Sequence, residues 1–216
     1  ATAPLNKESL HAAGFPFPGH TEILAARTHA ERSCMMLTSD EITCSLVTVH
    51  VGYREVPQLL TVQRILDTIE LSAEAMRHIR GRAPKLAVCG LNPHAGEHGV
   101  IGREDDELLL PAVQAARSAG IDVEGPLSPD TVFLQASQGR FDGVLALYHD
   151  QAFIPVKLLS HDGGVTVLAG LPYLRVSPVH GTAFDIAGTG RASPENLIQA
   201  LLLAGRWSAG AERGER

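Results

Sequence analysis

Three histidines of this chain lie in segments that we expect to be turns rather than faces of helices. They are His20 in Gly19-His20-Thr21-Glu22, His94 in Asn92-Pro93-His94-Ala95-Gly96-Glu97, and His149 in Tyr148-His149-Asp150-Gln151. A neutral imidazole is the commonest protein ligand for a divalent transition metal, and catalytic sites use three protein ligands with one open position. The alternative is that each ring is solvated, because a chain with ten histidines places several in loops by chance. The glycine and proline around these rings favour the metal site, since they fix the backbone that presents them.

Two of the three histidines directly follow segments with the pattern of a buried strand. Residues 85–91 (KLAVCGL) end just before the segment of His94, and residues 142–147 (DGVLAL) end just before Tyr148 and His149. In α/β sheets, ligands bind outside the carboxyl ends of the strands. We therefore expect His94 and His149 at the same edge of one sheet.

The rest of the chain alternates helical patterns with short apolar runs, which predicts a layered α/β fold. The expected helices cover residues 21–30, 61–78, 104–119, 130–137 and 194–204, and two further strands cover residues 33–38 and 42–50. The short link at residues 39–41 permits antiparallel pairing of these two strands, so we expect a mixed sheet. We also expect Thr21 to cap the first helix, the acidic run at 104–107 to be a solvated helix start, and Gly125-Pro126 to lie in a loop.

Length and composition exclude several classes of protein. The chain has 216 residues, 44% apolar and 19% charged, which suits one large or two small globular domains. A net charge of −6 and a pI near 5.9 argue against nucleic acid or an anionic membrane as partner. No apolar stretch is long enough to span a bilayer and no signal-peptide pattern is present, so we expect a cytoplasmic protein. Cys34, Cys44 and Cys89 show no Cys-x-x-Cys spacing, which predicts buried free thiols.

Two cationic residues lie where they could bind an anion. Lys157 follows His149 by one short element and can reach the same pocket, and Arg175 follows an apolar run and offers bidentate recognition. For either residue alone, a surface salt bridge is the simpler interpretation. The segment at residues 179–190 is rich in small residues, which allow a cofactor to approach the backbone closely. Composition alone favours an ordinary glycine-rich loop, and no Gly-x-Gly-x-x-Gly follows a strand.

Four motifs together resemble one known family. Residues 19–22, 90–97, 148–151 and 180–183 look like the 4-hydroxythreonine-4-phosphate dehydrogenase family of vitamin B6 biosynthesis, in order and spacing. The resemblance runs from Thr2 to about Leu203. It implies an isocitrate/isopropylmalate dehydrogenase-like fold in which the N-terminal part is missing, since this chain begins Ala1-Thr2-Ala3-Pro4. Residues 1–190 would form the metal- and substrate-binding domain, and residues 191–216 a helix and tail of the other domain.

The resemblance also assigns roles to residues. It makes His20, His94 and His149 ligands of a divalent metal (zinc, magnesium, manganese or cobalt), in a site shared between the subunits of a homodimer. The implied substrate-binding residues are Lys157, Thr166 and Arg175, with Thr166 standing where the family commonly has asparagine. The implied contacts to NAD or NADP are His180, Gly181, Thr182, Ala183 and Asp185. Asp150 and Lys157 are the candidates for proton transfer.

The implied reaction oxidises 4-phosphooxy-L-threonine with NAD or NADP and releases carbon dioxide to give 3-amino-2-oxopropyl phosphate. Because Thr166 loses the reach of an amide, the substrate could instead be another phosphorylated hydroxy acid, such as threonate or erythronate 4-phosphate, or a cis-dihydrodiol. Two other classes stay open, a zinc hydrolase and a non-catalytic fragment that binds metal and dimerises. The hydrolase lacks a His-Glu-x-x-His helix and leaves the segment that begins at His180 unexplained.

Overall fold

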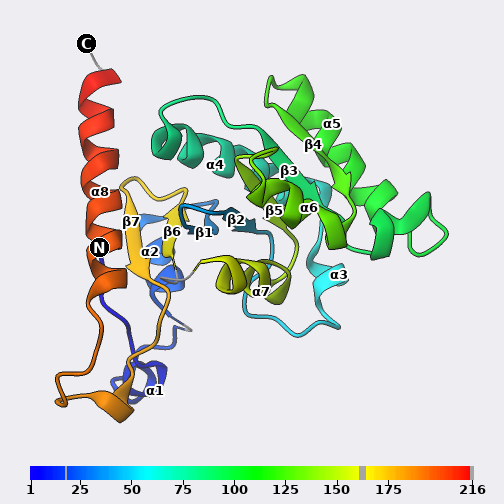
Figure 1. Cartoon of the computed structure of the whole chain (residues 1–216). Coiled ribbons are helices and arrows are strands. Elements are labelled where there is room, and N and C mark those ends of the chain that lie inside the picture. The colour runs from blue at the N-terminus through cyan, green and yellow to red at the C-terminus, as the bar shows by residue number, and fades with distance from the viewer. Residues whose placement is uncertain (18, 161–163, 215–216) are drawn as a thin grey trace.

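The structure is a computed structural model that describes residues 1–17, 19–160 and 164–214, with side chains as far as residue 208. Its centre is a seven-stranded sheet in the order β4-β3-β5-β2-β1-β6-β7 (Figure 1). The strands are β1 (Cys34–Thr38), β2 (Thr43–Leu46), β3 (Leu86–Cys89), β4 (Val123–Leu127), β5 (Gly143–Ala146), β6 (Val165–Ala169) and β7 (Arg175–Pro178).

The sheet is mixed, as the sequence predicts. Strands β2, β5, β3 and β4 run parallel, whereas β1 is antiparallel to both of its neighbours, and β7 is antiparallel to β6. The antiparallel pairing of β1 with β2 confirms the expectation drawn from the short link between them. Since β3 and β5 are adjacent and parallel, the segments that follow them leave the sheet at the same edge.

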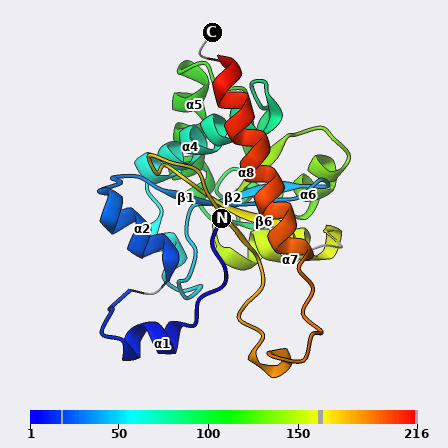
Figure 2. The ribbon, with the colours of Figure 1, turned by 90° about the vertical axis from the view of Figure 1, so that its left-hand side faces the viewer.

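Helices cover both faces of the sheet. They are α1 (Lys7–Ala12), α2 (His20–Thr28), α3 (Val56–Leu59), α4 (Val62–Arg80), α5 (Leu110–Ser118), α6 (Pro129–Ser137), α7 (His149–Leu159) and α8 (Glu195–Gly214). Buried side chains of α4, α5 and α8 form one core cluster with one face of the strands, and those of α6 and α7 form a second cluster with the other face. Figure 2 shows α8 crossing the β6 and β7 end of the sheet.

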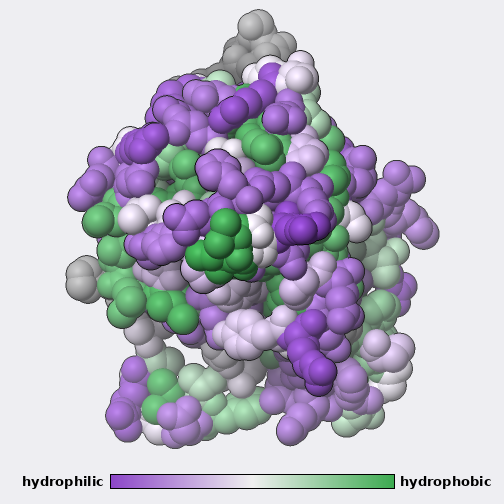
Figure 3. Space-filling view, turned by 90° about the vertical axis from the view of Figure 1, so that its right-hand side faces the viewer, coloured by the Kyte–Doolittle hydropathy of each residue, from purple (hydrophilic) through white to green (hydrophobic). Residues whose placement is uncertain are grey.

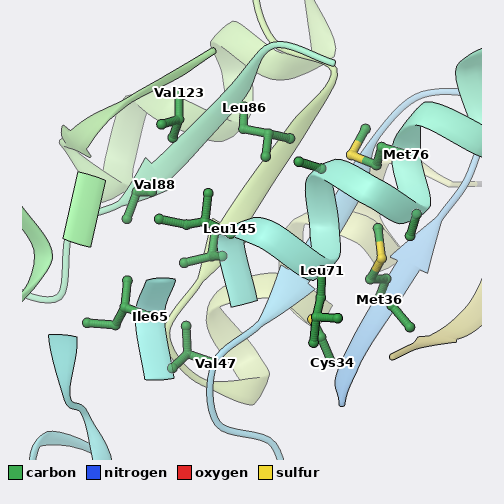
Figure 4. Packing of buried hydrophobic residues seen from close by; sticks show 14 of the residues in the cluster. Cys34, Met36, Val47, Ile65, Leu71, Met76, Leu86, Val88, Val123 and Leu145 are labelled. Carbon is green, nitrogen blue, oxygen red and sulfur yellow. The ribbon is translucent and has the colours of Figure 1, made fainter. Parts of the chain in front are cut away.

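The longest predicted amphipathic helix is confirmed as α4. The Thr61 hydroxyl caps it by accepting from the Arg64 N–H at 3.1 Å, and Gly81 ends it in the left-handed conformation with φ +69°. Ile65, Ile69 and Met76 recur at helical spacing and belong to the core cluster on this face of the sheet, where Figure 4 labels Ile65 and Met76.

Three local predictions are wrong. Helix α2 begins at His20 with Gly19 at its N-cap, so Thr21 lies inside the helix. Gly125 and Pro126 lie within β4 rather than in a loop, because an edge strand tolerates a proline that donates no ladder bond. Helix α8 is longer than the residues 194–204 expected.

The three cysteines are buried free thiols, as predicted. Burial raises the pKa of the Cys34 thiol to about 11, so this group stays protonated at neutral pH. Of the described helices, none has the length and apolar character needed to cross a membrane.

Candidate functional site

Several of the predicted residues, but not His94, gather around a cavity of about 390 Å³. Its walls come from the N-terminus of α2, the segment after β2, helix α7, strands β6 and β7, and the segment after β7. Among the residues that line it are His20, His50, His149, Lys157, Thr166, Arg175, Ser177, His180 and Gly181.

Two histidines of this cavity form a close pair. His149 is the first residue of α7, and its ring centroid lies 5.8 Å from that of His50. The ring of Phe153, one turn along α7, stacks on the other side of His149 with centroids 3.9 Å apart. Burial, together with the charges of Lys7 and His149, lowers the pKa of His50 and favours the neutral ring that a metal requires.

The sequence does not single out His50, because this residue stands at the end of the run 42–50, which the pattern predicts to be one strand. Strand β2 ends at Leu46, so His50 follows a strand in the same way as His94 and His149 do. That shared position after a strand is the signal that could have found it.

His20 lies beside a different group. It is the first residue of α2, and its pKa is lowered first by burial and then by the positive charge of Arg175. A neighbouring guanidinium disfavours any further positive charge at this ring. The surroundings of His20 therefore suit an anion better than a cation.

Arg175 lies on β7 and is 6% exposed, so the surface salt bridge considered for it is wrong. One terminal guanidinium nitrogen donates to the Thr2 hydroxyl at 2.9 Å, while the buried Nε has no partner among the described residues. Burial lowers the pKa of this guanidinium. A buried donor without an acceptor is costly. The guanidinium that carries it lines the cavity, where an anion would compensate its charge.

The floor of the cavity beside Arg175 is polar. Thr166 on β6 pairs with Ser177 on β7, and Arg175 stands two residues before Ser177, so all three side chains share one face of the sheet. Thr166 and Ser177 are both buried. This face offers hydroxyl groups next to a guanidinium.

Lys157 lines the same cavity, as predicted. It lies on α7 two turns beyond His149, with Nζ 5.8 Å from the centroid of the Phe153 ring. Lys7, Lys157 and Arg175 contribute positive charge to the lining, and Glu22 is its acidic residue. The cavity is therefore suited to an anionic ligand.

His94 faces elsewhere. It lines a second, apolar recess with Phe133, Tyr148, Asp150 and Ile154, among others. In the described part of the chain, no three His, Cys, Asp or Glu side chains converge closely enough to hold a metal ion. One copy of the chain thus brings His20, His50 and His149 to one cavity and leaves His94 outside it.

The segment that carries His94 has an unusual backbone. His94, Ala95, Gly96, Glu97 and His98 all have φ between +45° and +75°, a left-handed run that side chains with a Cβ rarely adopt. The run begins within the 3-10 turn η1 (Pro93–Glu97), so His94 is held in a turn, as predicted. The same prediction is wrong for His20 and His149, which begin helices α2 and α7.

A buried carboxylate supports this left-handed run. Asp105 is fully buried and accepts from the backbone N–H groups of Leu91 and Asn92 and from the Asn92 side-chain amide, at 2.8, 3.1 and 2.9 Å. The expectation that the acidic run at 104–107 is solvated is therefore wrong for Asp105. It begins a π-helical turn, η2 (Asp105–Leu109), that precedes α5.

The predicted cofactor residues lie on an exposed segment after β7. His180 donates from Nδ1 to the Gly181 carbonyl at 2.9 Å, and Ala183 has φ +48° before a short 3-10 turn, η3 (Phe184–Ile186). His180 and Gly181 reach the rim of the cavity, while Thr182, Ala183 and Asp185 lie beyond its lining. Figures 1 and 2 both show this segment leaving the sheet at the end of the molecule where α1 lies.

Comparison with known proteins gives one consistent result. The family model described as pyridoxal phosphate biosynthetic protein PdxA matches residues 1–204. A 4-hydroxythreonine-4-phosphate dehydrogenase of Geobacter metallireducens is 50% identical over 204 residues, covering 94% of this chain and 60% of that protein. A D-threonate 4-phosphate dehydrogenase of Salmonella typhimurium is 47% identical, covering 94% and 62%. The chain thus spans about three fifths of the length of these relatives.

Solved structures agree with these relatives. A 4-hydroxythreonine-4-phosphate dehydrogenase from Klebsiella pneumoniae superposes with a TM-score of 0.86 at 43% identity, covering 95% of this chain and 64% of that one. A terephthalate 1,2-cis-dihydrodiol dehydrogenase from Burkholderia xenovorans gives a TM-score of 0.75 at 29% identity, covering 94% and 65%. The predicted α/β fold with a mixed sheet is confirmed, and the chain belongs to the PdxA family of pyridoxal phosphate biosynthetic proteins.

Proposed function

We propose that this chain forms the metal- and substrate-binding part of a homodimeric dehydrogenase that oxidises 4-phosphooxy-L-threonine with NAD or NADP. The product after loss of carbon dioxide is 3-amino-2-oxopropyl phosphate. The observation that carries the proposal is the buried Arg175 guanidinium, whose Nε has no partner among the described residues, in a basic cavity that also holds a histidine pair.

The phosphate or carboxylate of the substrate would bind at the Arg175 side of the cavity. Arg175 supplies charge-assisted donors there, and His20, Thr166 and Lys157 lie in the same lining. Fixing the anionic group on a sheet face converts binding energy into orientation of the reacting carbon. A phosphorylated hydroxy acid matches this lining better than a neutral diol.

A divalent metal fits the histidine side of the cavity. The adjacent rings of His50 and His149 are suitable donors, and the lowered pKa of His50 favours its neutral form. We propose both as ligands together with the partner subunit's His94. His20, which the sequence resemblance placed in this set, is better suited to the anion because Arg175 lies beside it. When bound, the metal supplies Lewis-acid polarisation of the substrate hydroxyl.

The dimer is proposed because His94 lies apart from the other histidines, on an apolar surface. Ile154 and Leu158 line the same recess as His94, and their exposed fractions are 59% and 76%. Figure 3, seen from the side of α3, α5 and α6, shows apolar side chains in patches among polar ones. Apolar patches rimmed by polar residues are typical of protein interfaces.

NAD or NADP, when bound, supplies the hydride acceptor. The segment His180, Gly181, Thr182, Ala183 and Asp185 is proposed as its adenosine contact, since the segment is exposed and rich in small residues. Of the two proton-transfer candidates, Asp150 already accepts from Tyr53 and bonds His149, whereas Lys157 has its ammonium group free of ion pairs within the described residues. Lys157 is therefore the better candidate.

Two alternative substrates have specific support. The Salmonella typhimurium relative is named a D-threonate 4-phosphate dehydrogenase. That substrate would present the same phosphate group to Arg175. The Burkholderia xenovorans structure is that of a cis-dihydrodiol dehydrogenase. A non-catalytic role stays open because the chain spans only part of its relatives, whereas the hydrolase hypothesis gains no support from them.

The test is ligand binding and turnover with matched substrates. Calorimetry measures the affinity of three proteins: the unmodified chain, Arg175→Met and the exposed control Arg103→Met. The ligands are 4-phosphooxy-L-threonine, D-threonate 4-phosphate and unphosphorylated L-threonine. We expect both phosphate esters to bind, and Arg175→Met to lose at least tenfold in affinity. Equal binding of threonine and its phosphate would contradict the proposal.

Formation of NADH or NADPH is then measured with the same compounds. If the chain is inactive, fusing it to the part of the Geobacter metallireducens relative that the match leaves out separates an incomplete enzyme from a binding protein. Turnover by the fusion supports the dehydrogenase. If the fusion binds metal and substrate but forms no NADH or NADPH, the result supports the non-catalytic role.

A further inference from the structure

The hydrogen bonds around His149 determine which of its ring nitrogens carries the proton. The Tyr53 hydroxyl donates to Asp150 Oδ2 at 2.5 Å, and Asp150 Oδ1 lies 2.6 Å from His149 Nδ1. A carboxylate accepts hydrogen bonds and has no proton to give. His149 Nδ1 must therefore be the donor, and in the neutral ring Nε2 keeps its lone pair.

The hydrogen bonds around His94 lead to the same assignment by another route. The Ser128 hydroxyl lies 2.6 Å from Asp130 Oδ1 and 3.4 Å from His94 Nδ1. A serine has one hydroxyl proton, and the shorter bond to a carboxylate takes it. Ser128 Oγ then accepts from His94 Nδ1, so Nε2 of His94 also keeps its lone pair.

From these two series of hydrogen bonds we infer that Asp150 and Asp130 are positioning residues that hold His149 and His94 as Nδ1–H tautomers. In this form both rings present an unprotonated Nε2 to a ligand that accepts a lone pair, a divalent metal ion. Carboxylates behind metal-binding histidines commonly set the tautomer and the ring orientation. The inference rests on the proposed metal site for its function, whereas the tautomers themselves rest only on the hydrogen bonds.

Tyr53 has a specific part in this arrangement. Its side chain is 65% exposed, yet its hydroxyl is bonded to Asp150, and its ring packs edge-on against Tyr148 with centroids 5.5 Å apart. Asp150 is itself exposed at the start of α7, where its carboxylate could otherwise rotate into solvent. We assign to Tyr53 the role of holding the Asp150 carboxylate against His149.

The first test reads the tautomers directly, in metal-free protein labelled with ¹⁵N. Long-range ¹H–¹⁵N correlation spectra at mildly alkaline pH distinguish Nδ1–H from Nε2–H rings, with assignments from His149→Gln and His94→Gln. We expect Nδ1–H at both residues in the unmodified chain. Asp150→Ala should convert His149 to a mixture dominated by Nε2–H and leave His94 unchanged, and Ser128→Ala should do the reverse.

Matched controls separate positioning from general effects on the fold. Asp40→Ala, Tyr173→Phe and Ser137→Ala make the same chemical changes at other described sites and should alter neither ring. Asp150→Asn retains an accepting oxygen and should keep His149 partly in the Nδ1–H form. An Nε2–H ring at both histidines of the unmodified chain would overturn the inference.

The second test measures the affinity for Zn²⁺ or Co²⁺ by competition with a chelator. We expect Asp150→Ala to weaken binding by about 10-fold to 100-fold, and Tyr53→Phe by less. If metal binds equally well to all variants, the positioning role fails while the metal site stands. If the unmodified chain binds no metal but shows both Nδ1–H rings, the proposed metal site fails and the tautomer assignment stands.

Discussion

The ends of β3 and β5 lie side by side at one edge of the sheet, and each carries a histidine, yet they hold it by different means. After β3, the backbone itself is forced into a left-handed run, supported by the buried carboxylate of Asp105. After β5, an ordinary helix begins at His149, and side-chain hydrogen bonds at the surface orient the ring. Changes to buried backbone support should therefore affect stability at the first end, and changes to exposed partners should affect ligand binding at the second.

The largest expected effect is on the stability of the β3 end. Asp105→Asn keeps the shape of the side chain but turns an NH₂ group toward buried N–H donors. We expect it to lower the free energy of unfolding by about 3 kcal/mol, measured by urea denaturation. Asp106→Asn, its exposed neighbour in the same turn, should change stability by less than about 0.5 kcal/mol. Equal effects would show that Asp105 does not support the run.

The next effect is on metal binding. His94→Ala removes an exposed ring, so we expect the fold and the urea midpoint to be retained and the affinity for Zn²⁺ to fall about 100-fold or more. Elemental analysis and a chelator titration measure this, with His98→Ala in the same run as the control. If His94→Ala binds metal as tightly as the unmodified chain, the segment after β3 supplies no ligand to the metal site.

A smaller difference is expected between two histidines of the cavity. His50→Ala should weaken metal binding about tenfold or more, because its ring lies against His149, whereas His20→Ala should change it less than about threefold. For a phosphate ester the order should reverse, with the larger loss in His20→Ala. The opposite result in both titrations would restore His20 as the metal ligand.

The smallest expected effect is a change in pH dependence. Burial and Arg175 lower the pKa of His20 in the folded state, so below its unfolded value of about 6.5 the unfolded chain binds more protons. Stability is therefore lost as the pH falls below that value. Between about pH 7 and pH 5, the free energy of unfolding should decrease less in His20→Gln than in the unmodified chain, by under about 1 kcal/mol. Urea denaturation at each pH measures this difference. An unchanged slope would contradict the assigned surroundings of His20.

Local patterns predicted some elements well. Helix α4 could be predicted because Ile65 and Met76 lie on one helical face, between a threonine N-cap and a glycine C-cap. The positions of His94 and His149 after buried strands could also be predicted, since both strands are short apolar runs.

The features that were missed depend on contacts distant in sequence. Asp105 looks like part of an acidic helix start, and only the fold reveals that Leu91 and Asn92 donate to it. The pairing of His50 with His149 joins the segments that follow two neighbouring strands, β2 and β5, and only the fold shows that the two rings lie together. The division of the histidines between two recesses also follows from the fold rather than from spacing.

The polar face formed by Thr166, Arg175 and Ser177 belongs to regular strands, whereas the histidines stand on segments that follow strands. Strand register allows few insertions, because a shift by one residue turns every side chain to the other face. Segments between elements tolerate changes in length and sequence. Substitutions in these segments can therefore alter the histidine side of the cavity without shifting the register that places Thr166, Arg175 and Ser177 on one face of the sheet.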